Sequence, residues 1–294
     1  MRLLVTGAQG MLGHDVARAA QRGEHQAALV DLPELDITDA SAVQQLLERL
    51  RREPGGLDAI VNCAAWTDVD GAQSNERQAY AINAQGAGIL ADAAGAIGVS
   101  LLHISTDYVF DGEAPLDEQR RPRPYIESDL TGPRSVYGAS KLEGERRVLG
   151  ASRRHTVVRT AWLFGLDGNN FVATMLRLAT ERDAVQVVTD QIGSPTWSGH
   201  LAPGLLGLLE RGVSGLVHMT GGGIVSWNGF AAEIFRQADV DCRVEPASSA
   251  EMARPAPRPA WSALESERDD VLPLPPWQDG LAGYLAARAG MMRA

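Results

Sequence analysis

The segment Thr6-Gly7-Ala8-Gln9-Gly10-Met11-Leu12-Gly13 decides the fold of this chain. It lies between a short apolar run, Arg2 to Thr6, that is typical of a β-strand and a helical pattern from Asp15 to Gln21. Glycines at such a junction allow a tight turn, and the N-terminus of the following helix offers free N–H groups to a pyrophosphate. The residues that we expect to bind a dinucleotide here are Gly7, Gly10, Met11, Leu12 and Gly13. A plain strand–turn–helix junction with extra glycine is the simpler alternative.

The second expected strand, Gln26 to Val30, ends at Asp31. An acid at this position can accept hydrogen bonds from the ribose hydroxyls of NADH and repel the 2′-phosphate of NADPH. Asp31 therefore predicts a preference for NADH, which the nearby cations Arg2 and Arg18 could weaken. An ordinary aspartate in the turn after a strand is the alternative.

Two further places along the chain are expected to touch the cofactor. Asp36 and Ile37 precede a helix that runs to about Arg52, and Asp36 is a candidate either for the adenine or for the cap of that helix. Ala64 and Ala65 end an apolar run, 58–65, that is typical of a parallel strand buried on both faces. Side chains as small as alanine suit a backbone that lies against the cofactor.

Apolar runs alternate with helical patterns along most of the chain. Further strands are expected at 100–104, 155–159, 185–189 and 216–219. This alternation predicts an α/β protein with a doubly wound parallel sheet of the Rossmann type. We expect residues 1–160 to form an NAD(P)-binding domain, to which strands within about 185–220 return. Residues 161–294 are expected to form largely a smaller, substrate-binding lobe.

The segment Val136-Tyr137-Gly138-Ala139-Ser140-Lys141 carries the candidate chemistry. Side chains four apart share one face of a helix, so Tyr137 and Lys141 are expected to project together. A nearby ammonium stabilises a phenolate and brings a tyrosine toward the range where it exchanges protons. Thr106 follows the strand 100–104, at the carboxyl end where open parallel sheets bind ligands. An exposed helical pair is the commoner meaning of this spacing, so the catalytic interpretation depends on the dinucleotide site and Thr106.

The composition argues against several classes of partner. The chain has 294 residues, 45% hydrophobic and 22% charged, with a formal net charge of −10. We expect no nucleic-acid partner, because that would require a basic face. No apolar run is long enough to span a membrane and the N-terminus does not resemble a signal peptide, so we expect no membrane association and a cytoplasmic location. The two cysteines and six histidines show no metal-ligand spacing, and no metal site is predicted.

Two features stay open from the sequence. Segment 115–133 is rich in proline, arginine and acids. This composition fits a loop that closes over the site and an uninvolved surface loop equally well. Asn83, in the expected helical stretch 77–94, is a candidate either for holding the end of a strand or for positioning the cofactor.

Taken together, these features resemble the extended short-chain dehydrogenase/reductase superfamily and, more closely, the dTDP-4-dehydrorhamnose reductase family. The resemblance covers nearly the whole chain, and its most specific motif is Ser105-Thr106-Asp107-Tyr108-Val109-Phe110-Asp111-Gly112. The other matching motifs are Thr6-Gly7-x-x-Gly10-x-Leu12-Gly13, Val61-Asn62-x-Ala64-Ala65-x-Thr67-x-Val69-Asp70, Tyr137-Gly138-x-x-Lys141-x-x-Gly144-Glu145, Arg159-Thr160-x-Trp162, Asn170-Phe171, Asp190-Gln191-x-Gly193-x-Pro195-Thr196 and Arg258-Pro259-x-x-Ser262.

The resemblance implies a reductase that uses NADH or NADPH to reduce the C4 keto group of dTDP-4-dehydro-L-rhamnose, a nucleotide sugar. It implies catalytic roles for Thr106, Tyr137 and Lys141, and substrate contacts from Asp107, Tyr108 and Trp162. We add Arg258 as a candidate for the diphosphate, because a guanidinium can bind two phosphate oxygens at once. Its alternative is a solvated surface charge.

Some relatives in this family dimerise through acidic residues and magnesium. Asp15 occupies one plausible ligand position, but the sequence offers no convincing partner acids. The resemblance therefore leaves both a magnesium requirement and a homodimer open.

Three other functions are compatible with the same fold. A 4-ketoreductase for another dTDP-deoxysugar, from a streptose or antibiotic-sugar pathway, would use identical catalytic residues. A sugar-nucleotide dehydratase would need Asp-Glu after the threonine, whereas this chain has Asp107-Tyr108. A non-catalytic dinucleotide-binding regulatory subunit would not need Thr106, Tyr137 and Lys141 together.

Overall fold

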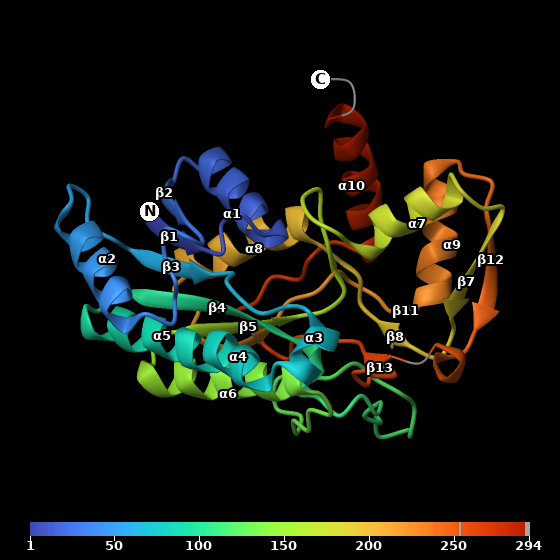
Figure 1. Cartoon of the computed structure of the whole chain (residues 1–294), viewed down its shortest axis with the longest axis horizontal. Helices are drawn as coiled ribbons and strands as arrows, with labels where there is room; N and C mark the ends of the chain where they lie inside the picture. The colour runs from blue at the N-terminus through green and yellow to red at the C-terminus, as the bar shows by residue number, and fades with distance from the viewer. Residues whose placement is uncertain (253, 292–294) are drawn as a thin grey trace.

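A parallel sheet lies at the centre of the computed structural model, which describes residues 1–252 and 254–291 (Figure 1). Its six strands lie in the order β10-β5-β4-β3-β1-β2, and every pairing between them is parallel. The direction of strand addition reverses between β1 and β3, which is where open parallel sheets bind ligands. The strands are β1 (Arg2–Thr6), β2 (Gln26–Val30), β3 (Ala59–Asn62), β4 (Ser100–Thr106), β5 (Thr156–Thr160) and β10 (Gly215–His218).

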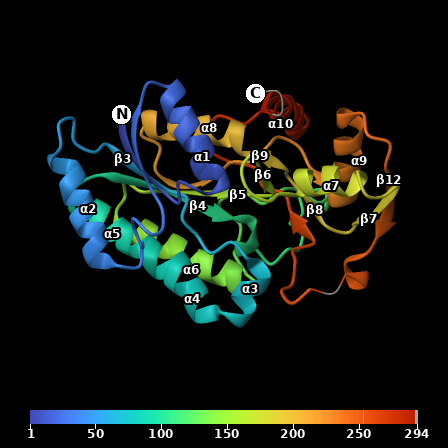
Figure 2. The same ribbon diagram turned by 45° about the horizontal axis from the view of Figure 1, so that its top comes forward.

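Helices cover both faces of this sheet (Figure 2). α1 (Met11–Arg22) and α8 (Ser198–Glu210) lie on one face, and α2 (Ala40–Arg52), α5 (Ala87–Ala96) and α6 (Val136–Ala151) lie on the other. Successive side chains of a strand point to opposite faces. Within β1, accordingly, Leu3 and Val5 pack in the core beside α1 and α8, whereas Leu4 packs in the core beside α2 and α5. The predicted doubly wound fold is confirmed. None of the described helices is long and apolar enough to cross a membrane.

The expected helix 77–94 is three elements in the structure: α4 (Glu76–Tyr80), a π-helical turn η1 (Ala81–Gly86), and α5. The short helix α3 (Val69–Ser74) precedes them. Asn83 lies in the π-helical turn, fully buried. Its side chain accepts from the N–H of Trp66 at 2.8 Å and donates to the carbonyl of Trp66 and the hydroxyl of Ser140. Asn83 therefore ties the chain that leaves β3 to α6, which is the structural alternative that the sequence left open.

The second half of the chain builds a lobe with its own core at the end of the sheet (Figure 1). Phe164, Phe230 and Trp277 are buried at the centre of this core. Its helices are α7 (Phe171–Ala179), α9 (Trp227–Ala238), α10 (Trp277–Met291) and the short η3 (Ser249–Glu251). Its strands are β6 (Leu163–Phe164), β7 (Ala184–Val188), β8 (Ile192–Gly193), β9 (Thr196–Trp197), β11 (Val225–Ser226), β12 (Arg243–Ala247) and β13 (Trp261–Ser262).

One expectation about the domain organisation was wrong. Of the two later strands expected to return to the central sheet, only β10 does so, beside β5. β7 pairs instead with β12, over the full register from Ala184 opposite Arg243 to Val188 opposite Ala247. The backbone groups of β7 are thus satisfied by a partner strand inside the lobe.

A buried ion pair joins β5 to α6. The guanidinium of Arg159 donates to both carboxylate oxygens of Glu145, at 2.9 and 2.7 Å. Ser105, near the end of β4, donates to the same carboxylate at 2.5 Å. The side chains of Arg159 and Glu145 are only 4% and 3% exposed. The guanidinium also lies 5.0 Å from the centre of the Phe110 ring.

We expect the replacement Arg159→Met to lower the free energy of unfolding by about 3–5 kcal/mol, because it leaves the Glu145 carboxylate buried without its partner. Urea-induced unfolding followed by circular dichroism would measure the change. The matched control is Arg52→Met, since Arg52 pairs with Glu48 on the surface of α2 with a side chain 74% exposed. Surface pairs contribute little. Equal losses in the two variants would contradict the structural role of the Arg159–Glu145 pair.

Candidate active site

A pocket of about 720 Å³ opens at the carboxyl ends of the central strands, between the sheet and the lobe. The residues that the sequence assigned to the cofactor, to catalysis and to the substrate line it, although their individual roles stay predictions; Asn83 and Asp15 do not. The lining residues from this set are Gly7, Gly10, Met11, Leu12, Gly13, Asp31, Asp36, Ile37, Ala64, Ala65, Thr106, Asp107, Tyr108, Tyr137, Lys141, Trp162 and Arg258. The pocket therefore brings the expected cofactor, catalytic and substrate residues together.

The glycine turn between β1 and α1 fits a dinucleotide. Gly7 has a φ of +68°, and a Cβ added there would lie 2.5 Å from the backbone nitrogen of Ala64. α1 starts after Gly10 without any side-chain cap, and Gly10 to Gly13 line the pocket. N–H groups of an uncapped first turn are available to a ligand, and the helix dipole favours an anion there. This cradle suits a diphosphate.

Asp31 lies at the end of β2, across from the glycine turn. Its carboxylate accepts hydrogen bonds from the N–H of Gln9 at 2.9 Å and of Leu32 at 2.8 Å. Oxygen lone pairs beyond these two bonds remain for a ligand in the pocket. The position agrees with an acid that contacts a ribose.

The two arginines expected to weaken this preference are engaged elsewhere. Arg2 forms an ion pair with Glu53, and Arg18 pairs with Asp15 at 3.0 Å and with Asp167 at 2.7 Å. Among the described residues, neither arginine lines the pocket. The two arginines are near Asp31 in the sequence, but their side chains pair with other acids.

Asp36 and Ile37 also line the pocket. The carboxylate of Asp36 accepts from the N–H and the hydroxyl of Thr38, at 2.9 and 2.7 Å. The cap of α2 is Asp39, which accepts from the N–H groups of Ser41 and Ala42. Asp36 therefore shapes the loop before α2 and is not its cap residue.

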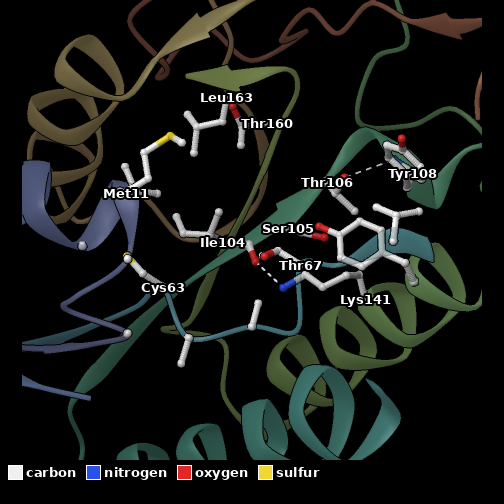
Figure 3. A pocket seen from close by; sticks show the side chains of 18 of the residues that line it. Met11, Cys63, Thr67, Ile104, Ser105, Thr106, Tyr108, Lys141, Thr160 and Leu163 are labelled. Atoms are coloured by element: carbon white, nitrogen blue, oxygen red, sulfur yellow. Dashed lines mark hydrogen bonds between the residues drawn. The ribbon is translucent and has the colours of Figure 1, made fainter. Parts of the chain in front are cut away.

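Thr106 ends β4 and is held in one orientation by its neighbours. Its hydroxyl accepts from the N–H of Tyr108 at 3.2 Å (Figure 3). It donates to the Asp107 carboxylate at 3.1 Å. Both residues after it belong to η2 (Asp107–Val109). Burial raises the pKa of Asp107 to about 6, although the hydroxyl of Thr106 donates to one of its carboxylate oxygens. A carboxyl group of this kind exchanges protons close to neutral pH.

Tyr137 and Lys141 lie one turn apart at the start of α6, as the spacing predicted. Their charge states differ from the expectation, however. Burial raises the pKa of Tyr137 to about 12. Burial also lowers the pKa of Lys141 to about 8. The cause is common, because a low-dielectric environment disfavours a phenolate and an ammonium alike.

The amine of Lys141 points toward the backbone of Ile104 on β4 (Figure 3). It donates to the carbonyl of Ile104 at 2.6 Å and lies 3.1 Å from Nε2 of His103. Sequence reasoning missed His103 completely, because it lies inside an apolar strand with no spacing that relates it to Lys141. Only the pairing of β4 with its neighbours brings it below the α6 helix.

Two stacked indoles form the wall of the pocket on the side of the lobe. Trp162 follows β5 and has a φ of +46°, an unusual conformation for a bulky residue. Its ring lies 3.6 Å from that of Trp227, at an interplanar angle of 8°. Such strain costs roughly 1–3 kcal/mol and is typical of functional sites. Trp227, like Gln191 in the same wall, was not identified as a candidate from the sequence.

Arg258 reaches the pocket from the segment before β13, where its guanidinium is paired with a carboxylate. It donates to both oxygens of Asp70 on α3, at 3.0 and 2.8 Å. The N–H of Ala256 donates to the same carboxylate at 3.1 Å. A phosphate in the pocket would therefore share or replace Asp70 as the partner of Arg258.

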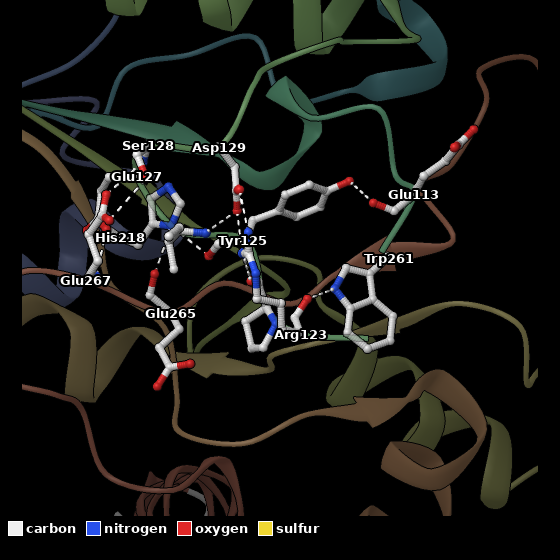
Figure 4. Close-up of polar contacts among 12 residues, drawn as sticks. Glu113, Arg123, Tyr125, Glu127, Ser128, Asp129, His218, Trp261, Glu265 and Glu267 are labelled. Atoms are coloured by element: carbon white, nitrogen blue, oxygen red, sulfur yellow. Dashed lines mark hydrogen bonds and ion pairs between the residues drawn. The ribbon is translucent and has the colours of Figure 1, made fainter. Parts of the chain in front are cut away.

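Segment 115–133 does not line the pocket within the part of the chain that the structure describes, but it supports the segment that does (Figure 4). Tyr125 exchanges backbone hydrogen bonds with Ala263 and Glu265, and the indole N–H of Trp261 donates to the carbonyl of Arg123 at 3.0 Å. Glu127 accepts from the N–H of His218 at 2.7 Å. The segment is thus a brace between β10 and the chain around β13, and neither alternative from the sequence describes it.

Asp15, the one residue considered for magnesium, is buried in α1. Its carboxylate accepts from the hydroxyl of Ser198 at 2.5 Å and pairs with Arg18. In residues 1–252 and 254–291, no group of three or more His, Cys, Asp or Glu side chains is placed to hold a metal ion. The contacts of Asp15 join α1 to α8.

The sheet order, the uncapped glycine turn and the Tyr137–Lys141 helix define a protein of the extended short-chain dehydrogenase/reductase class. The model of the family described as "RmlD substrate binding domain" matches residues 1–289, and the chain belongs to this family.

Curated and solved proteins agree with this assignment. A dTDP-4-dehydrorhamnose reductase of Mycobacterium tuberculosis is 46% identical over 98% of this chain and 93% of its own. A protein of Streptomyces antibioticus named "Probable dTDP-4,6-dihydroxy-2-methyloxan-3-one 4-ketoreductase" is 42% identical over 96% of this chain and 93% of its own. The crystal structure of the dTDP-4-dehydrorhamnose reductase of Bacillus anthracis in complex with NADP has a TM-score of 0.90, at 38% identity, and covers 97% of this chain and 99% of that one.

We expect the replacement Tyr137→Phe to remove most turnover while dinucleotide affinity changes little, because only the phenol O–H is lost from a buried ring. General acid–base groups typically contribute about 10²–10⁴ in rate. Steady-state kinetics and the quenching of protein fluorescence by NADH would measure the two effects. Tyr80→Phe, on α4 away from the pocket, is the matched control. Near-normal kcat for Tyr137→Phe would exclude Tyr137 as the proton donor.

Asp31 is expected to favour NADH over NADPH, and Asp31→Asn should shift the ratio of kcat/KM values toward NADPH by about tenfold, or 1.4 kcal/mol. The physical reason is the loss of repulsion between the carboxylate and the 2′-phosphate. Asp39→Asn, at the cap of α2 and outside the pocket lining, should leave the ratio unchanged. A wild-type enzyme with strong preference for NADPH would contradict the assigned role of Asp31.

Proposed function

We propose that this protein is an NAD(P)H-dependent reductase that converts the C4 keto group of dTDP-4-dehydro-L-rhamnose to the alcohol of dTDP-L-rhamnose. The observation that carries this proposal is that Thr106, Tyr137 and Lys141 line the same pocket as the glycine turn of α1. The substrate is supported by the relative from Mycobacterium tuberculosis, whose name specifies this reaction and which matches 98% of the chain. NADP in the related Bacillus anthracis structure supports a nicotinamide cofactor.

Tyr137 is the proton donor in this reaction. The dinucleotide, when bound against the glycine turn, supplies the hydride. Because burial holds the pKa of Tyr137 at about 12, the phenol keeps its proton at neutral pH and is present as the acid that the reduction needs. Thr106 would donate a hydrogen bond to the same substrate oxygen by turning its single O–H away from Asp107, which accepts it in the structure. Lys141 would serve the ribose of the cofactor and balance the charge left on Tyr137.

The wall of the lobe would bind the sugar nucleotide. The stacked rings of Trp162 and Trp227 offer a broad apolar face to a deoxysugar. Within the described residues, Arg258 is the one arginine that lines the pocket. Its guanidinium would bind the diphosphate. Binding energy from these remote contacts can be used to orient the keto group for reduction. Residues 1–160 with β10 would hold the cofactor, and the lobe would hold the substrate.

A 4-ketoreductase for another dTDP-deoxysugar is the second candidate function. The relative from Streptomyces antibioticus favours it, because that protein is named as a 4-ketoreductase of a different dTDP-sugar and is 42% identical to this chain. The proton donor, the hydroxyl of Thr106 and the cofactor site would be the same for both substrates. The two functions differ only in how the wall of the lobe fits the sugar.

A cytoplasmic location and a homodimer belong to this proposal as well. The cytoplasm supplies both nucleotide sugars and reduced dinucleotides. Size-exclusion chromatography with light scattering would measure the oligomeric state directly.

The proposed substrate is tested by incubating the enzyme with NADH or NADPH and a panel of dTDP-4-keto-sugars, followed by identification of the product. We expect dTDP-L-rhamnose from its C4 keto precursor, with a higher kcat/KM than for the other sugars. Consumption of NADH with other keto-sugars but not with this precursor would favour the second candidate function.

We expect Trp162→Ala and Arg258→Ala each to lower kcat/KM for the sugar nucleotide by at least about tenfold, or 1.4 kcal/mol, without altering NADH affinity. The first variant removes the apolar wall, and the second removes the cation for the diphosphate. Arg134→Ala is the control, since Arg134 is an exposed arginine that pairs with Glu113 and lies outside the pocket lining. If kcat/KM falls equally in the control, the two side chains have no specific role in substrate binding.

A further inference from the structure

The hydroxyl of Thr160 is buried and has no hydrogen-bond partner among the residues that the structure describes. Thr160 ends β5, is 6% exposed and lines the pocket (Figure 3). A buried polar group without a partner costs free energy, and in folded proteins such a group is normally satisfied by a neighbour, by water or by a ligand. Neither the fold nor the proposed reaction has yet given this hydroxyl a role.

The alternation of side chains along β5 determines the direction of the hydroxyl. Arg159 meets Glu145 of α6 on one face of the sheet. Val158 packs on the other face, in the core beside α1 and α8. Because successive residues of a strand point to opposite faces, Thr160 projects to the same face as Val158. α1 begins at the glycine turn, so Thr160 faces the half of the pocket in which the dinucleotide would lie.

Other pocket residues on this face are apolar. Met11 is the first residue of α1, and Ile104 and Leu163 pack against the same core as Val158. Their side chains carry no N–H or O–H group. Thr160 therefore adds a hydrogen-bonding group to a face that otherwise offers these apolar side chains to a ligand.

Thr160 also lies next to the strand that carries the expected chemistry. In the parallel pairing of β4 with β5, Thr106 is the residue opposite Thr160. Neighbouring strands are about 4.8 Å apart, so a ligand group at Thr160 is close to the place where Thr106 and Tyr137 would hold the reacting oxygen. Arg258 and the stacked indoles, in contrast, reach the pocket from the lobe. Thr160 therefore belongs to the cofactor side of the reacting centre.

The nicotinamide ring carries a group that fits this hydroxyl. Its primary carboxamide has one carbonyl acceptor and two N–H donors, and a threonine hydroxyl can donate to the carbonyl or accept from an N–H. Neither group carries a charge that burial would penalise. We propose that Thr160 is a cofactor-binding residue whose hydroxyl holds the carboxamide of the nicotinamide. The inference rests on the proposed function, because it requires a nicotinamide dinucleotide in the pocket.

Isothermal titration calorimetry without sugar nucleotide tests the contact. The ligands are two pairs, NADH with ADP-ribose and NADPH with ADP-ribose 2′-phosphate, in which the second member lacks only the nicotinamide. We expect Thr160→Val to weaken binding of the dinucleotides by about three- to tenfold, as for the loss of one hydrogen bond, and to leave the two ADP-ribose ligands unaffected. Valine keeps the branched shape of threonine. Thr160→Ser, which keeps the hydroxyl, should retain the wild-type affinity.

Thr156→Val is the matched control on the same strand. The hydroxyl of Thr156 is also buried, but it donates to the carbonyl of Val213 at 2.8 Å and lies outside the pocket lining. This variant should leave the affinity ratio within each ligand pair unchanged. Its Tm should fall, because the carbonyl loses its donor. Thr160→Val without ligand should unfold at or above the wild-type Tm, since the hydroxyl that it removes has no partner in the described chain.

An unchanged dinucleotide affinity in Thr160→Val overturns the proposal, even if KM for the keto-sugar rises. Equal losses within each ligand pair overturn it too, because they would indicate a general change of the pocket. A lower Tm of the ligand-free variant would show that the hydroxyl bonds within the chain, which is equally incompatible with the proposal. A wild-type protein that binds neither NADH nor NADPH contradicts the proposed function itself. Normal binding with no effect of Thr160→Val contradicts this inference alone.

Discussion

The buried ion pair between Arg159 and Glu145 is the interaction on which the site depends. It connects β5 to α6 and takes a third bond from Ser105 on β4. A buried pair of this kind contributes little net stability, because desolvation of both charges offsets their attraction. Its effect is geometric: it determines the rotation of α6 against the sheet. Tyr137 and Lys141, on the preceding turns of the same helix, face the pocket as a result.

Close packing brings the chemistry together once α6 is oriented. A Cβ at Gly138 would lie 2.1 Å from the carbonyl oxygen of Tyr108, so only glycine allows the helix to approach η2 this closely. The approach places Tyr137 beside Tyr108, with ring centres 5.4 Å apart, and beside Thr106. The same exclusion of water raises the pKa of Tyr137 and lowers that of Lys141. One physical cause therefore shifts both pKa values toward the uncharged forms of the two side chains.

The lobe completes the pocket with residues that come from distant parts of the chain. β8 pairs with β11 on one side and with β13 on the other, which brings the chain around Gln191, Trp227 and Ser262 to one wall. The brace formed by segment 115–133 holds the β13 region against the end of β10 (Figure 4). The cofactor side of the pocket is thus built from consecutive strand ends, and the opposite side from segments joined only by tertiary contacts.

The sequence by itself determined the doubly wound sheet, the glycine turn and the helical pairing of Tyr137 with Lys141. These features depend on the period of apolar residues and on spacings of a few residues, which the backbone geometry converts directly into structure. Tertiary structure alone decided that β7 pairs with β12, that Trp227 stacks on Trp162, and that His103 meets Lys141. Each of these contacts joins residues far apart in the chain, and its partners are selected by side-chain direction and by burial across the sheet. A local sequence pattern does not predict these contact partners, because the same strand or helix would form beside a different partner.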